Sequence, residues 1–275
     1  MKPILNTTVL TAITLLSWQI ITTKTLAQEV RKDSTIPSEK DAIALMQNIC
    51  GAGNIVKEQG RIGCKKCPSF TRYSGDSGGS LTSVVYGSFT KAGSREALVD
   101  LGDCEPRVSN WGGSVLLRRT NQGLSRIRYE QGLRSHSCLK VPNKTGRDSL
   151  VCEGSYTGQG YFITWLEHIE LGTTKTKNIN LLKVESNTAT CRPPFYAVGI
   201  QDFMLQDTNQ DRLADLVVKV TEAREPKDTT RSSDDQCEPK LSESKLHQLT
   251  FLNNGQSFQA TPNTAHLIKQ FGFVE

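Results

Sequence analysis

The sequence predicts an all-β protein, and three observations support this. Beyond residue 82, short runs rich in β-branched and aromatic residues are separated by turn residues at roughly 8–15 positions, a spacing typical of all-β folds. Near the C-terminus, Asn254 and Gly255 lie between two strand-like runs, which is a strong signal for a type I′ hairpin. Finally, similar segments recur 52 and 66 residues apart, which indicates a repeated unit. They align on Leu98, Leu150 and Leu216.

Each expected strand is short and ends at a turn signal. The last two form the hairpin around Asn254 and Gly255. The expected strands are Val84–Phe89, Glu96–Leu101, Val115–Leu117, Ile127–Tyr129, Leu139–Val141, Leu150–Cys152, Tyr161–Leu171, Ile179–Val184, Tyr196–Ile200, Phe203–Leu205, Leu216–Val220, Leu249–Leu252 and Ser257–Gln259.

One helix is expected, at Ser38–Cys50. Ser38 and Asp41 have the spacing of an N-terminal cap, and Gly51 provides a stop signal after the last turn. Apolar residues recur at helical spacing on one face, so the helix should pack on the body of the protein. They are Ala42, Leu45, Met46 and Ile49.

A loop between two apolar runs carries oxygen side chains at the spacing that a hard cation needs. Asp207, Asn209, Asp211 and Asp215 occupy positions 1, 3, 5 and 9 of this loop, and the Leu213 carbonyl lies at position 7. Calcium accepts about six to eight oxygens, so this set predicts one structural Ca²⁺ site. The alternative interpretation is a solvated acidic turn without an ion.

The exit from this loop argues against an EF-hand. An EF-hand needs Gly at position 6, Glu at position 12 and flanking helices. Here position 6 is Arg212, position 12 is Val218, and the exit sequence is β-branched. The expected site is therefore a strand–loop–strand site, and Arg212 should weaken it because Arg tolerates a positive φ poorly.

The loop resembles the calcium loops of FG-GAP and VCBS repeats, which build integrin-like β-propellers. The resemblance is specific over residues 203–218, where Leu216 also matches the repeat pattern, and it is diffuse elsewhere. It implies a β-propeller-like array of short antiparallel strands, and about 200 β-rich residues allow roughly four to six blades. A β-sandwich is the competing fold.

The N-terminus has the features of a secretory signal peptide. Lys2 precedes a mostly apolar run, and Thr25-Leu26-Ala27 resembles a cleavage site. The run is too short and too polar for a membrane span, so no span is expected after cleavage, and the protein should be secreted or periplasmic. Removal of two lysines lowers the formal net charge from +5 to +3, which does not favour a nucleic-acid partner.

Eight cysteines follow the signal segment, an even number that in an exported chain predicts disulfide bonds. We expect Cys138 to pair with Cys152 across a hairpin and Cys191 with Cys237 across a polar loop. The remaining four, Cys50, Cys64, Cys67 and Cys104, should pair among themselves. A redox or zinc role for the C-x-x-C pair is disfavoured, because neither a βαβ pattern nor a matching second pair is visible.

The chain should be organised in four parts. Residues 1–27 are the signal peptide, 28–37 a disordered polar segment, 38–80 a helix with a Cys-rich segment, and 81–275 the β-domain. A polar loop at 222–246, with two Glu-Pro pairs, is expected to be inserted between strands of that domain.

Three functions are compatible with the sequence, in which we identify no catalytic residues. The first is a binding module for an extracellular protein or glycan. The second is an extracellular hydrolase on a propeller scaffold, since folds do not fix function. The third is a purely structural envelope protein.

Overall fold

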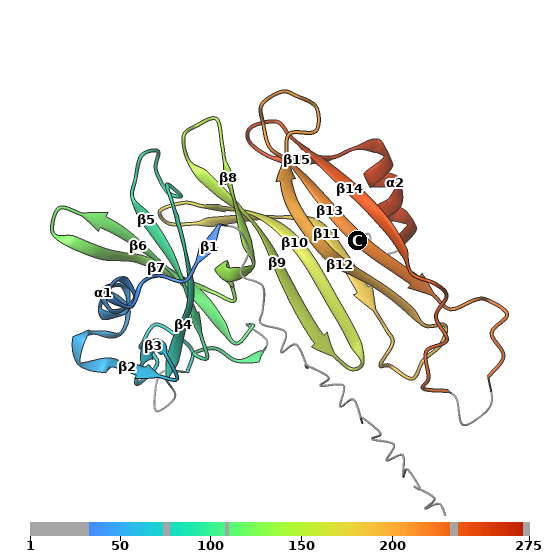
Figure 1. The fold of residues 1–275 in the computed structure, drawn as a ribbon, viewed down its shortest axis with the longest axis horizontal. Coiled ribbons are helices and arrows are strands. Elements are labelled where there is room, and N and C mark those ends of the chain that lie inside the picture. Colours follow the sequence, from blue (N-terminus) through green and yellow to red (C-terminus); the bar gives the residue numbers. More distant parts are fainter. Residues whose placement is uncertain (1–32, 74–77, 108–109, 232–235, 272–275) are drawn as a thin grey trace, which may run out of the picture.

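The computed structural model describes residues 33–73, 78–107, 110–231 and 236–271. It confirms an all-β protein with a short N-terminal helix. The strands form two antiparallel sheets in which neighbours in sequence are neighbours in space (Figure 1). The predicted signal peptide at 1–27 lies outside the described residues.

The first sheet has seven strands. Its order is β2-β3-β4-β5-β6-β7, and β1 pairs with β4. The strands are β1 (Ser34–Thr35), β2 (Ile55–Glu58), β3 (Arg61–Cys64), β4 (Gly79–Gly87), β5 (Glu96–Gly102), β6 (Gly112–Thr120) and β7 (Gly123–Gln131).

The second sheet has eight strands. Its order is β15-β14-β13-β12-β11-β10-β9-β8, and it curls, since β8 contacts β12 although they are four places apart. The strands are β8 (Cys138–Pro142), β9 (Asp148–Gly158), β10 (Tyr161–Leu171), β11 (Thr176–Ser186), β12 (Tyr196–Gln206), β13 (Asp215–Arg224), β14 (Lys245–Asn253) and β15 (Phe258–Ala260).

The sheet order differs from the expected propeller-like ring. Propeller blades are separate sheets of four strands, whereas here seven and eight strands pair continuously. The two sheets share a core, as in the competing sandwich prediction: Val85, Leu98 and Leu116 of the first sheet pack with Leu150 and Ile169 of the second. Of the aligned repeat positions, Leu98, Leu150 and Leu216 are all fully buried within strands.

Helix α1 (Glu39–Cys50) forms as its sequence predicts. Its first turn is capped by Ser38, whose Oγ accepts the Asp41 N–H, and it ends at Gly51 with φ +85°. The four predicted apolar residues of α1 are buried against the outer face of the seven-stranded sheet. The apolar spacing therefore places α1 on the sheet face opposite the core shared by the two sheets.

A second helix, α2 (Pro262–Phe271), was not predicted from the sequence, and it packs on the face of the curled sheet that does not contact the first sheet (Figure 1). Thr261 caps it: its Oγ1 accepts the Thr264 N–H, and its carbonyl accepts the Ala265 N–H. Pro262 suits the first helical position, where no N–H is needed. The layer order is therefore α1, first sheet, second sheet, α2.

Two features of the predicted domain boundaries require correction. Ser34 and Thr35 were expected to be disordered, but they pair with Val85 and Val84 of β4. An unpaired edge at this point of β4 would leave backbone groups without partners, and β1 supplies them. The predicted Cys-rich segment is likewise part of the first sheet, through β2 and β3.

All predicted disulfide pairings are confirmed. Cys138 is bonded to Cys152 and Cys191 to Cys237, while the N-terminal four pair as Cys50–Cys64 and Cys67–Cys104. The C-x-x-C cysteines therefore bond to different partners. The Cys191–Cys237 bond ties the polar loop between β13 and β14 to the segment before β12. Four disulfides are typical of proteins from oxidising compartments.

A buried histidine in β10 makes the stability of the fold depend on pH. His168 is almost fully buried; its Nε2 lies 2.8 Å from Ser149 Oγ, and its Nδ1 has no partner among the described residues. Burial lowers the pKa of this imidazole. Folding therefore favours the neutral form, and protonation in the unfolded state opposes folding at acidic pH.

We expect the free energy of unfolding to fall with pH because His168 is neutral in the folded protein. The stabilisation that depends on neutral His168 is fully present above the unfolded-state pKa of about 6.5. It is lost as the pH falls from there through the lower folded-state pKa, at up to about 1.4 kcal/mol per pH unit. His168→Gln should therefore lose less free energy of unfolding between pH 7 and 5 than the unmutated protein, measured by urea denaturation. His266→Gln, at an exposed position, is the control. Equal pH slopes for His168→Gln and the unmutated protein would contradict this.

Candidate functional site

The predicted calcium loop links β12 to β13 and is braced by its own backbone. Asp207 Oδ2 accepts the Arg212 N–H at 3.0 Å, Asn209 Oδ1 the Asp211 N–H at 3.1 Å, and Asp211 Oδ1 the Leu213 N–H at 2.8 Å. These bonds fix the three predicted side chains within one tight turn. Arg212 has φ +70°, so position 6 of the loop does adopt the conformation that normally requires Gly.

Asp215, the fourth predicted side-chain ligand, is used differently. It is fully buried; its Oδ2 accepts hydrogen bonds from the backbone and hydroxyl of Thr208, and its Oδ1 accepts the Asn253 N–H at 2.8 Å. Asp215 therefore fastens the loop to the β14–β15 hairpin. An ion in the loop would compete with these donors for Asp215, so the residues that fit an ion best are Asp207, Asn209, Asp211 and the Leu213 carbonyl.

A metal centre built from several charged side chains is not found in the part of the chain that the structure describes. No group of three or more His, Cys, Asp or Glu residues there is placed to hold a metal ion. Any ion in the 207–213 loop would therefore depend on amide, carbonyl and water oxygens besides its two carboxylates.

Among the described residues, no helix is long and apolar enough to cross a membrane.

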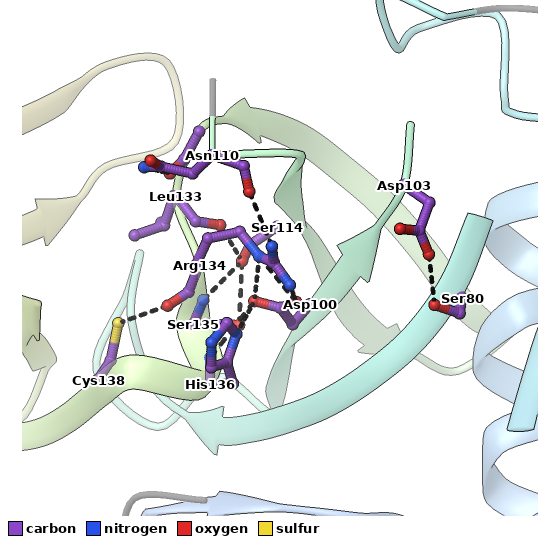
Figure 2. A network of polar contacts seen from close by, with 11 residues as sticks. Ser80, Asp100, Asp103, Asn110, Ser114, Leu133, Arg134, Ser135, His136 and Cys138 are labelled. Carbon is purple, nitrogen blue, oxygen red and sulfur yellow. Dashed lines mark hydrogen bonds and ion pairs between the residues drawn. The ribbon is translucent and has the colours of Figure 1, made fainter. Parts of the chain in front are cut away.

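A second site, which was not predicted from the sequence, lies where the chain passes from the first sheet to the second. The connection between β7 and β8 contains Arg134 and His136, and both side chains point at Asp100 of β5 (Figure 2). Asp100 is fully buried. The Arg134 Nε and Nη2 groups donate to Asp100 Oδ1 at 3.1 and 2.8 Å, and His136 Nδ1 lies 3.0 Å from Oδ2.

The charge state of this network follows from its contacts. Burial by itself would raise the pKa of Asp100, but the hydrogen bond from His136 and the charge of Arg134 outweigh burial and hold that pKa below its usual range. Asp100 is therefore ionised and accepts from His136, which places the imidazole proton on Nδ1. The His136 backbone N–H also donates to Asp100, at 3.3 Å.

The network continues into both neighbouring segments. Ser114 of β6 donates to the Leu133 carbonyl at 2.7 Å and accepts the Ser135 N–H at 3.2 Å. Arg134 Nη1 donates to the Asn110 carbonyl at 2.8 Å. The connection between the sheets is thus fixed at several points to β5, to β6 and to the segment that precedes β6.

A cleft of about 320 Å³ opens beside this network, and we call it the junction cleft. Arg134 and His136 lie in its wall, and exposed aromatic rings lie at its rim: Trp111 is 56 % exposed and Tyr156 46 %. An adjoining cavity of about 190 Å³ shares lining residues with it. The shared residues are Asn110, Arg134, Glu153 and Gly154.

The backbone at the rim is held in an unfavourable conformation. Asn110 and Trp111 have φ +51° and +58°. Asn visits this left-handed region routinely, whereas for Trp it costs about 1–2 kcal/mol. Hydrogen bonds sustain it: Asn110 Nδ2 donates to the Gly132 carbonyl at 3.1 Å, and the Trp111 carbonyl accepts the Asp103 N–H. Backbone held in this way often marks a functional site.

The adjoining cavity contains a carboxyl group with an altered pKa. Glu167 of β10 is half-buried there, and burial raises its pKa. The Trp165 ring lies in the same cavity against Gly154, where an added Cβ would come within 2.4 Å of the ring. The absence of a Cβ at Gly154 therefore leaves the space that the Trp165 ring occupies.

One feature of the sequence could have indicated the network at the junction of the two sheets. Asp100 occurs within the apolar run Ala97–Leu101, and a charge in a fully buried strand is rarely found without a partner. The identity of its partners could not be read from sequence, because Arg134 and His136 follow 34 and 36 positions later.

Comparisons with known proteins add no assignment. No family model, no curated protein and no solved structure matches this chain.

Proposed function

We propose that this protein is an exported binding module that holds a neutral glycan in the junction cleft. The main support for this proposal is that Trp111 and Tyr156 expose their rings on the rim of a cleft lined by polar groups. Aromatic faces pack well against the apolar C–H faces of sugar rings, while polar side chains and backbone groups bind the hydroxyl groups. The signal-like N-terminus and four disulfides support export.

The charges around the cleft favour a neutral ligand. Arg134 is already paired with Asp100, yet two of its five N–H groups remain for a ligand hydroxyl. Arg107 donates to the Thr157 carbonyl at 2.7 Å, and Glu153 balances its charge in the same wall. The formal charges of these four side chains, two positive and two negative, sum to zero, which weakens any attraction for an ionic partner.

Isothermal titration calorimetry of the mature chain with cellohexaose, chitohexaose and mannohexaose tests the proposal. We expect at least one neutral oligosaccharide to bind with a Kd below about 1 mM, and an oligogalacturonate of similar length to bind more weakly. Absence of heat with every neutral oligosaccharide, or preference for the charged one, would reject it.

We further propose that the 207–213 loop binds one structural Ca²⁺ ion. The support is that Asp207, Asn209 and Asp211 are oriented by backbone N–H groups within one turn, and that Arg212 adopts the positive φ that such a loop requires. The ion would neutralise the carboxylates and stabilise the turn between β12 and β13.

Calcium should therefore stabilise the fold. At 100 times its Kd, an ion that binds only the folded state adds about 2.7 kcal/mol, seen as a higher melting temperature that EGTA reverses. Asp211→Ala should abolish this effect, and Asp228→Ala, in an exposed loop, should leave it unchanged. Arg212→Gly should raise the stability without calcium by about 0.5–1 kcal/mol, because relief of the positive φ outweighs the added entropy of the unfolded chain. A melting temperature insensitive to calcium would refute the ion site.

Hydrolysis of the bound glycan is the second candidate function. It is favoured by Glu167, whose raised pKa suits a general acid, and by Glu153, which lines the same cavity. Chromatography of each oligosaccharide after prolonged incubation decides between the two. A binding module leaves the oligosaccharide intact, whereas a hydrolase yields shorter sugars and loses this activity in Glu167→Gln. The third alternative, a purely structural envelope protein, is favoured if no ligand binds.

A further inference from the structure

A cavity of about 600 Å³ lies between α1 and the ends of strands β4 to β9, and it shares no lining residue with the junction cleft. This volume falls within the range of sites for small organic ligands, roughly 300–1,000 Å³. The proposed glycan-binding function does not use this cavity.

Part of the cavity wall is apolar. Leu45 of α1 and Ala97 of β5 are buried there, and Leu124 of β7 is half-buried. Tyr86 of β4 adds a ring that remains 47 % exposed. These side chains offer a hydrophobic surface to a ligand that enters from solvent.

Two arginines line the cavity where β5 begins and β6 ends. Arg95 precedes β5 and Arg119 lies in β6, and the Arg119 N–H donates to the Arg95 carbonyl at 2.8 Å. Both side chains are exposed, and neither makes a hydrogen bond or ion pair with any residue that the structure describes. Two like charges at neighbouring cross-strand positions repel each other, so an anion between them would relieve that repulsion.

The acidic residues of the cavity are already engaged. Glu96 forms an ion pair with Arg118, Asp148 accepts the Ser88 N–H at 2.7 Å, and Asp41 accepts the Ser38 hydroxyl at 2.7 Å. None of the three forms an ion pair with Arg95 or Arg119.

We propose that this cavity binds a small amphiphile, with its single anionic group on Arg95 and Arg119 and its apolar body against Leu45, Ala97, Leu124 and Tyr86. The unpaired guanidinium groups would supply charge-assisted hydrogen bonds, and the apolar wall would supply the hydrophobic contribution. A neutral apolar molecule lacks the first of these contributions and a small anion lacks the second.

Titration of the full mature chain with octanoate, 1-octanol and acetate tests the proposal. Octanoate should bind at least tenfold more tightly than either of the other two, because only octanoate combines both features. The double variant Arg95→Gln/Arg119→Gln should lose at least tenfold in octanoate affinity and keep its 1-octanol affinity. The matched control Arg61→Gln/Arg192→Gln removes two exposed arginine charges outside this cavity and should bind octanoate unchanged.

Octanoate binding no tighter than 1-octanol, or a double variant within twofold of the unmutated affinity, would overturn the proposal. So would Arg95/Arg119-dependent cosedimentation with phosphatidylglycerol vesicles in a protein that does not bind free octanoate, since the ligand would then be a membrane surface. Glycan affinity should be the same with and without octanoate, so failure of either proposal leaves the other testable.

Discussion

Replacing Asp100 by asparagine should lower the free energy of unfolding by about 3–5 kcal/mol, the usual cost of removing one partner from a buried ion pair. Arg134 would remain largely buried without a countercharge, and His136 would lose the acceptor that orients its imidazole. The effect should be large because these contacts hold the segment through which the chain passes from the first sheet to the second (Figure 2).

Asp103→Asn is the matched control. It makes the same chemical change at an exposed residue, where Oδ2 accepts a hydrogen bond from Ser80 at 2.9 Å, and it should change the stability by less than about 0.5 kcal/mol. Urea denaturation measures both variants. A loss below about 1 kcal/mol in Asp100→Asn would show that the network does not hold the junction.

The pH dependence of this effect has a defined sign. The pKa of Asp100 is lower in the folded protein than its usual value. Its contribution is therefore fully present above the unfolded-state pKa of about 3.9, and it is lost as the pH falls through the folded-state value. The stability difference between the unmutated protein and Asp100→Asn should be constant at neutral pH and should shrink only in this acidic range.

Replacing Trp111 by alanine should weaken glycan binding by at least tenfold. Tryptophan is among the residues that most often act as binding hot spots, which contribute about 2 kcal/mol or more, and 1.4 kcal/mol corresponds to tenfold in Kd. Because Trp111 is exposed and has φ +58°, its loss should change the stability little.

Phe162→Ala is the matched control for this variant. Phe162 of β10 exposes a comparable fraction of its ring, 46 %, but does not line the junction cleft. Calorimetric titration should give the unmutated affinity for Phe162→Ala. Equal weakening in both variants would indicate non-specific contact with aromatic surface and not a defined site.

Local features of the fold were predictable because local interactions determine them. The cap and apolar face of α1 and the strand positions beyond residue 78 follow from nearby residues. The hairpin around Asn254 and Gly255 forms, but the predicted type I′ turn is wrong: Asn253 pairs with Phe258, and Asn254 lacks the positive φ that this turn requires. The grouping of strands does not: consecutive antiparallel pairing is common to a propeller blade and to a long meander, so the sequence could not distinguish separate blades from two continuous sheets. Helix α2 was missed because its amphipathic pattern is short.

The same distinction applies to the two sites. The 207–213 loop is contiguous in sequence, and its positive φ at Arg212 was expected. The buried role of Asp215 was not, because it depends on Asn253 in a distant hairpin. The junction cleft combines Trp111, Arg134 and Tyr156 from separate segments, and only the packing of the two sheets brings them together.

Nuclear magnetic resonance of the indole groups tests the central claim most directly. The mature chain contains two tryptophans, Trp111 and Trp165, since Trp18 lies in the predicted signal segment. Both line the junction cleft or its adjoining cavity, and Trp111→Ala assigns their N–H signals. Titration with the tightest-binding neutral oligosaccharide should shift the Trp111 signal in a saturable manner. Saturated binding that leaves both indole signals unmoved would contradict a glycan site in the junction cleft.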